Sequence, residues 1–165
     1  MIRQYCQEDL PGIAELIECF ATESGCFDVV GGFSRLHFLS TLESIKTWLR
    51  IWVRDSNRTI ISALAMVEQT NPYSGEKGLE ELFWFSRPEY RGSIENVKLL
   101  KAAENYAKEN QVFYMAMGSM IGFHPPKIEL FYENRGLKLH QKHYVRPILK
   151  TTKLGDGICY KARKN

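Results

Sequence analysis

The chain has 165 residues, of which 44% are hydrophobic and 25% charged. It is long enough to bury a core of its own and has the composition of an ordinary globular protein. We expect one domain over residues 1–149 and a basic tail over residues 150–165. The tail holds five basic residues and one acidic residue, a charge of +4, whereas the whole chain carries +3. The domain is therefore close to neutral, at about −1 (+3 minus +4), which argues against a nucleic-acid-binding surface.

Stretches rich in apolar, aromatic and β-branched residues predict the strands. The predicted strands span residues 1–6, 52–54, 59–69, 79–85, 112–117 and 137–148, the last being a strand or a hairpin. Residues 55–57, Asp-Ser-Asn, suit the turn of a hairpin between the second and third strands. The stretch 79–85 is dense in leucine and aromatic residues, as expected for a strand buried on both faces. Pro88 should end it, because proline cannot donate a hydrogen bond to a sheet.

Apolar residues at helical spacing predict four helices. Residues that cap or start helices place their beginnings at Asp9, Ser34, Ser93 and Pro125. The second helix should span residues 34–49, and residues 22–33 before it should form a loop. The third should bury an apolar face made of Ile94, Val97, Leu100, Ala103 and Ala107. The order β-α-α-β-β-β-α-β-α-β predicts an α/β protein with a mixed sheet and helices on both faces.

The four cysteines (Cys6, Cys19, Cys26 and Cys159) have no CxxC spacing and follow no signal-peptide pattern. We therefore expect reduced thiols in a cytoplasmic protein. The chain has no HExxH or similar signature, so we expect no metal. Apolar runs are too short to span a membrane, and no membrane partner is expected.

Residues 87–92, RPEYRG, followed by KLLKAAENYAKE, resemble motif A of the GNAT N-acetyltransferases. In that family, the turn Arg/Gln-x-x-Gly-x-Gly/Ala holds the pyrophosphate of acetyl-CoA. Arg91 matches the first position, whereas Ile94 and Asn96 stand at the two small positions. The opening IRQYCQEDLPGIAELI and the ending FYENRGLKLHQKHYV are also similar to the family. The resemblance implies a mixed, mostly antiparallel central sheet and acetyl-CoA as co-substrate.

Physical chemistry also favours an anion at this turn. A strand that passes through Arg91, Gly92 and Ser93 into a helix presents free N–H groups and the positive end of the helix dipole. The alternative is a turn that only starts a helix, which explains Gly92 and Ser93 but not Arg91. Glu95, in the first helical turn, repels an anion and stabilises the helix end by itself.

Acetyl transfer to an amine needs a proton acceptor for the amine, donors for the developing oxyanion and an acid for the departing thiolate. The resemblance implies that Tyr132 is the general acid and Glu81 the base. It also implies that the backbone of Trp84, Phe85 and Ser86 pairs with the pantetheine arm of acetyl-CoA.

Structural roles are the alternatives for both side chains. Tyr132 also fits a core aromatic residue on a helix that faces the sheet. Glu80 and Glu81 also fit a solvated strand end, and alternation along the strand sends them to opposite faces.

Two functions stay open at this point. One is an N-acyltransferase that moves the acetyl group of acetyl-CoA to an amine of a small molecule or a protein. The other is a catalytically inactive GNAT-like structural or interaction protein, because GNAT-like chains with an altered motif A turn resemble small proteins of tailed phages. The second would place the chain in a virion, with a phage assembly component or a second copy of itself as partner. An acetyltransferase acting on charged tRNA would need a basic face, which the composition does not favour.

Overall fold

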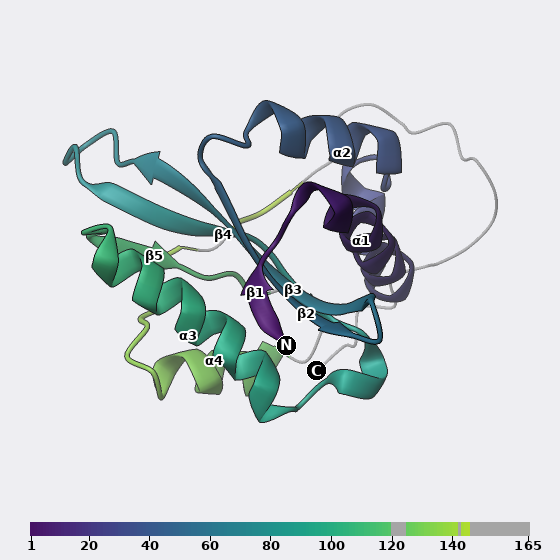
Figure 1. Ribbon diagram of the computed structural model, residues 1–165. Helices are drawn as coiled ribbons and strands as arrows, with labels where there is room; N and C mark the ends of the chain where they lie inside the picture. Colours follow the sequence, from purple (N-terminus) through teal and green to yellow (C-terminus); the bar gives the residue numbers. More distant parts are fainter. Residues whose placement is uncertain (120–124, 142, 146–165) are drawn as a thin grey trace, which may run out of the picture.

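The computed structural model describes residues 1–119, 125–141 and 143–145 (Figure 1). Within them, the strands form one sheet in the order β1-β2-β3-β4-β5. The strands are β1 (Ile2–Gln4), β2 (Leu49–Ser56), β3 (Thr59–Thr70), β4 (Lys77–Ser86) and β5 (Tyr114–Ala116). Neighbours from β1 to β4 are antiparallel, and β5 is parallel to β4. This mixed, mostly antiparallel sheet is the one predicted.

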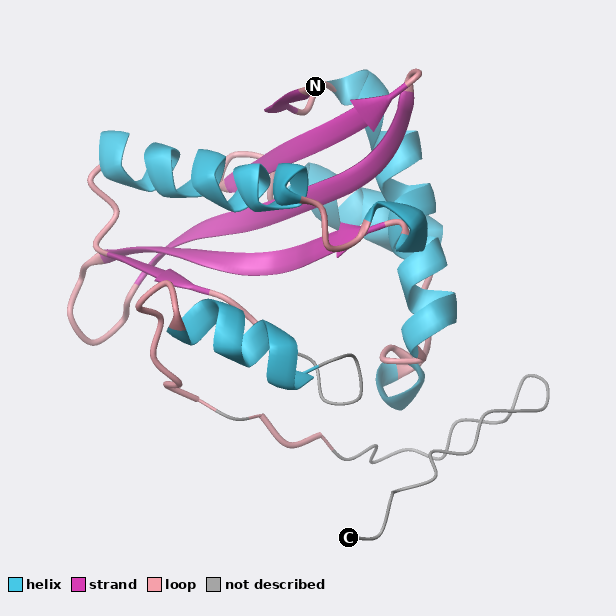
Figure 2. Ribbon diagram, turned by 90° about the horizontal axis from the view of Figure 1, so that it is seen from below, coloured by secondary structure: helices cyan, strands magenta, loops and turns pink. Residues whose placement is uncertain are grey.

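Helices cover both faces of the sheet (Figures 1 and 2). The helices are α1 (Leu10–Ser24), α2 (Arg35–Ser44), α3 (Ile94–Glu109) and α4 (Pro125–Glu133). On one face, α1 and α2 bury a core that includes Phe83 and Phe85 of β4. On the other face, α3 packs on Leu64 and Leu79, and Phe131 of α4 joins the same core.

The helix starts at Ser34 and Ser93 are confirmed. The Ser34 hydroxyl accepts the N–H of His37, and the Ser93 hydroxyl accepts the N–H of Glu95. Such bonds satisfy backbone donors that have no partner inside the helix. The strand stop before Pro88 is also confirmed, since β4 ends at Ser86 and η3 (Pro88–Tyr90) follows.

Five local predictions are wrong. The second helix ends at Ser44, because Leu49 is a buried strand residue opposite Val67 rather than the last apolar position of a helix. α1 begins directly after Asp9, as predicted, but the Asp9 side chain makes no capping bond; its carboxylate accepts bonds from Arg3 and from the Cys6 N–H. The predicted loop at 22–33 begins later, because α1 continues to Ser24.

The fourth error concerns the final strand. Residues 137–141 and 143–145 lie outside any strand, and the remainder of the predicted stretch, like the tail at 150–165, lies outside the described residues. Leu139, Tyr144 and Val145 are 76%, 92% and 60% exposed, so this segment presents no buried apolar face to the sheet. On α3, Ile94 is exposed in place of the predicted burial, because it occupies the first helical position, beside the turn.

β4 separates from β5 partway along its length. It pairs with β3 from Lys77 to Ser86 but with β5 only from Gly78 to Glu80. Among the described strands, residues 81–86 therefore have no partner on the β5 side. We call this opening the β4–β5 split.

A bulge lies at the start of the β4–β5 split. Met66 of β3 lies opposite Glu81 and Ala65 lies opposite Phe83, so Leu82 is the extra residue. Bulges leave a residue unpaired and redirect the side chains beside it. Here the bulge lets Glu81 and Phe83 point to opposite faces, although they are two residues apart.

Candidate active site at the β4–β5 split

Glu81 and Tyr132, from separate elements, meet at one residue of the chain leaving β5. The Gly118 N–H donates to Oε2 of Glu81 at 2.9 Å. The carbonyl of the same residue accepts the Tyr132 hydroxyl at 3.2 Å. Gly118 therefore holds the carboxylate from β4 and the phenol from α4 side by side.

The surroundings shift both groups toward their protonated forms. Burial raises the pKa of Glu81 from 4.5 to about 7, although hydrogen bonds from Gly118, Tyr132 and the Trp84 N–H oppose the shift. Burial and the neighbouring Glu81 charge raise the pKa of Tyr132 well above its ordinary range. At neutral pH, Glu81 is therefore divided between a form that accepts a proton and one that holds it, while Tyr132 remains a donor.

The strand residues predicted to pair with a pantetheine arm occupy three different settings. Trp84 is partly buried, with its ring 6.1 Å from that of Phe131. The Phe85 carbonyl accepts the Ser62 hydroxyl at 3.1 Å, which turns it toward β3 and away from the β4–β5 split. The Ser86 side chain is buried against Ser62, with 2.6 Å between the hydroxyl oxygens.

The turn before α3 has the predicted form. Gly92 has φ 70°, in the left-handed region that glycine tolerates at little cost. No acceptor among the described residues takes the N–H groups of Gly92, Ser93 or Ile94. They are the donors that the start of a helix leaves open to an anion.

Arg91 extends from this turn toward α1. Its guanidinium forms a two-pronged pair with Glu23, with Nη1 2.6 Å from Oε1, and its Nε donates to the Ser86 carbonyl at 3.0 Å. Its Cζ lies 4.9 Å from the centre of the Phe85 ring. Arg91 thus ties the turn to α1 and stacks on the core aromatic residue beneath it.

Sequence reasoning did not identify Glu23, Gly118 or the role of Asn96. Asn96 is buried, donates from Nδ2 to the Tyr90 carbonyl at 2.7 Å and accepts from Nη1 of Arg54 at 3.0 Å. It therefore fastens the turn at the position where the family pattern has a small residue. The sequence did contain a signal for the role of Asn96, because it is a polar residue between apolar positions of α3. Glu23 and Gly118 carry no local signal, because their partners are distant in sequence.

Glu95 is less repulsive to an anion than the sequence suggests. Nζ of Lys98 lies 2.5 Å from its carboxylate and lowers the pKa of Glu95. Within the described part of the chain, no group of three or more His, Cys, Asp or Glu side chains is placed to hold a metal ion. None of its helices has the length and apolar character needed to span a membrane.

Comparison with known proteins gives a match at the level of structure. No protein-family description and no curated protein matches the chain by sequence. An acetyltransferase from Trypanosoma brucei superposes with a TM-score of 0.68 at 15% identity, covering 90% of this chain and 99% of that one. The aminoglycoside 6'-N-acetyltransferase from Acinetobacter haemolyticus gives 0.65 at 14%, with the same coverage.

A protein described as a transcriptional regulator, from Bacillus halodurans, superposes equally well. Its TM-score is 0.71 at 16% identity, covering 90% of this chain and 99% of that one. At such identities the likeness concerns the fold, and the site has to be argued from its own residues. The protein has the fold of the GNAT acetyltransferases, as the resemblance of its RPEYRG turn predicted.

Proposed function

We propose that the chain is an N-acetyltransferase that moves the acetyl group of acetyl-CoA to an amine. The observation that carries the proposal is the meeting of Glu81 and Tyr132 at the β4–β5 split. A proton acceptor and a proton donor for acyl transfer thus lie next to each other at an opening in the sheet.

The path from this pair to the turn before α3 fits an extended thioester. Ser86 lies five residue steps along β4 from Glu81, a rise of about 17 Å, comparable with an extended pantetheine arm. The free N–H groups of Gly92, Ser93 and Ile94 lie just beyond and suit the pyrophosphate. The thioester would then lie beside Glu81 and Tyr132.

The roles of the two side chains follow from their protonation. Ionised Glu81 accepts a proton as the amine nitrogen attacks the thioester carbon and the new C–N bond forms. Tyr132 donates its proton to the sulfur as the C–S bond breaks. Backbone N–H groups at the β4–β5 split, including that of Trp84, are available to the developing oxyanion once Glu81 turns toward the amine.

One observation favours the alternative, a GNAT-like structural or interaction protein. Glu23 holds Arg91, the residue that matches the pyrophosphate arginine of the family. In that alternative, the turn before α3 and its arginine only join α3 to α1.

Calorimetric titration with acetyl-CoA and with CoA separates the two functions. We expect both to bind, and thiol release to accelerate with at least one member of a panel of primary amines. Tyr132→Phe should lower turnover by roughly 10²-fold while leaving acetyl-CoA affinity within about twofold, because the ring and its packing remain. Tyr73→Phe, on an exposed hairpin residue, is the matched control. Absence of binding heat with both nucleotides would leave the structural alternative.

A further inference from the structure

We propose that Glu23 is an internal competitor for the anion site at the turn before α3. Its carboxylate holds the guanidinium of Arg91, and the phosphate groups of a ligand have to displace it. This inference rests on the proposed function and concerns the regulation of the same site. It implies that binding at the turn is transmitted to α1, which packs on the opposite face of the sheet from α3.

Arg91 is anchored by contacts that do not involve Glu23. Its Nε donates to the Ser86 carbonyl at 3.0 Å, and its Cζ lies 4.9 Å from the centre of the Phe85 ring. Glu23 binds the two terminal nitrogens, Nη1 and Nη2. Carboxylate and phosphate oxygens fit the same pair of guanidinium donors. Exchange of Glu23 for a phosphate group therefore leaves the guanidinium in place.

The exchange takes place beside further donors for the same anion. The N–H groups of Gly92, Ser93 and Ile94 follow directly on Arg91, and no described residue accepts them. They lie at the positive end of the dipole of α3, a helix of 16 residues. An anion with several charges can contact these N–H groups and the guanidinium together. It therefore gains contacts that the single carboxylate from α1 does not make.

The position of Glu23 makes it a partner that an anion can displace. It lies in the last turn of α1, which has no basic residue, and the carbonyl groups at a helix C-terminus repel a carboxylate. The side chains of Arg91 and Glu23 are 28% and 35% exposed, so water and salt screen the pair. Because partly exposed ion pairs are weak, the competition lowers the affinity for the anion by at most about fivefold.

Displacement of Glu23 also changes what holds the end of α1. The pair with Arg91 ties the last turn of α1 to the turn before α3. Directly after Glu23, the Gly25 N–H closes the helix on the Ala21 carbonyl at 3.0 Å. Once Glu23 leaves Arg91, residues 21–25 lose this tie to the rest of the fold. An anion bound at the turn should therefore be detectable at these residues.

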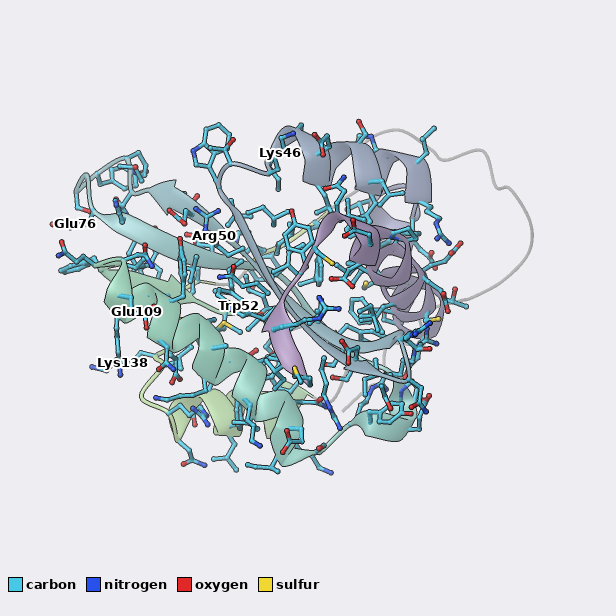
Figure 3. The ribbon with its side chains drawn as sticks, viewed as in Figure 1. Lys46, Arg50, Trp52, Glu76, Glu109 and Lys138 are labelled. Atoms are coloured by element: carbon cyan, nitrogen blue, oxygen red, sulfur yellow. The ribbon has the colours of Figure 1, made fainter. Side chains whose placement is uncertain are left out.

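The test is NMR titration of the full-length protein with inorganic pyrophosphate at pH 7.5, a probe that does not depend on turnover. We expect Glu23→Gln to bind pyrophosphate about fivefold more tightly than wild type, a gain that shrinks as salt is raised. The matched control is Glu15→Gln, which breaks the other ion pair of α1 with this region, to Arg87 at 2.7 Å, and should change the affinity by less than about twofold. Glu109→Gln controls for net charge, because it lies about 22 Å along α3 from Ile94 (Figure 3).

Amide resonances of α1 report the displacement itself. In wild type, pyrophosphate should shift the resonances of residues 21–25 and leave those of residues 12–16 in place, because only Glu23 leaves its arginine. In Glu23→Gln the shifts at residues 21–25 should be absent, whereas those of the turn before α3 should persist. In an Arg91→Ala background, Glu23→Gln should bring no gain in affinity, because the group for which carboxylate and pyrophosphate compete has been removed.

The outcomes separate the two proposals. Tighter pyrophosphate binding by Glu23→Gln without turnover of any amine would defeat the proposed acetyl transfer and leave the competition between Glu23 and the anion. Turnover with acetyl-CoA together with equal pyrophosphate affinity in wild type and Glu23→Gln would overturn the competition and leave acetyl transfer. The same gain in the Arg91→Ala background, or absence of pyrophosphate binding to both wild type and Glu23→Gln, would also overturn the competition.

Discussion

Replacing Glu81 with glutamine should remove most of the pH dependence of stability between pH 5 and pH 8. The pKa of Glu81 is raised from 4.5 to about 7 by burial, so the folded protein binds the proton more tightly than the unfolded chain. The stability that this proton contributes is fully present below pH 4.5 and is lost as pH rises through about 7. Wild type should therefore unfold more easily at pH 8 than at pH 5.

The size of the effect follows from the same pKa difference. The two values differ by about 2.5 (7 minus 4.5), which at about 1.4 kcal/mol per unit gives an upper bound of about 3.5 kcal/mol. Glu81 retains some solvent contact, so we expect a change of about 2 kcal/mol. For a chain of this length, that corresponds to roughly 4–8 °C in Tm. Asp9, with a pKa of about 2, does not titrate in this range.

The assay is urea unfolding of wild type, Glu81→Gln and Glu109→Gln at pH 5, 6, 7 and 8. Glutamine keeps an oxygen for the Gly118 N–H and mimics the neutral acid, so its curve should be nearly flat. Glu109 is exposed, and its variant should follow wild type. Parallel curves for wild type and Glu81→Gln would refute the reasoning, because they would mean that the carboxylate is as well solvated in the folded state as in the unfolded chain.

Three further predictions concern stability. Arg3 holds the pKa of Asp9 at about 2, below its usual 3.8, so Asp9 stabilises the fold above pH 3.8 and loses this effect as pH falls through 2. Asp9→Asn should lower the free energy of unfolding at pH 7 by about 2 kcal/mol in urea unfolding. A change near zero would show that the ion pair between Arg3 and Asp9 does not stabilise the fold. Gly78→Ala should lower Tm by several degrees because its Cβ would collide with the Tyr114 ring. A Tyr114→Ala background should relieve most of that loss, and an equal loss in both backgrounds would contradict the clash. Arg91→Ala should cost about 1–2 kcal/mol through its stacking and hydrogen bonds. A double-mutant cycle with Glu23→Gln should show coupling of roughly 0.5–1 kcal/mol, and additive effects would exclude the pair.

The parts of the fold that the sequence predicted correctly depend on neighbouring residues. Ser34 and Ser93 begin helices because each hydroxyl bonds to an N–H two or three residues away. Pro88 ends β4 because it has no backbone N–H to donate to the sheet. Helical spacing of apolar residues wrongly extended the second helix to Leu49, which is a strand residue that pairs with Val67 across the sheet.

The site was only partly accessible from the sequence. The RPEYRG turn and the helix after it predicted a GNAT-like fold, and the structural matches confirm that fold. The roles of Tyr132, Glu81, Arg91 and the strand residues stay predictions for the experiments above. Position alone could not show that Arg91 points toward Glu23, because that contact spans 68 residues.

The sequence by itself determined where α2 and α3 begin, where β4 ends and which turn joins β4 to α3. Those properties depend on caps, proline and short-range apolar spacing. Tertiary structure decided which groups meet and how they ionise. The Leu82 bulge and the early end of β5 bring Glu81 to Gly118 and Tyr132, while Glu80 faces the opposite side. Burial at that junction raises the pKa of Glu81, and burial is a property of packed elements that no local stretch of sequence encodes.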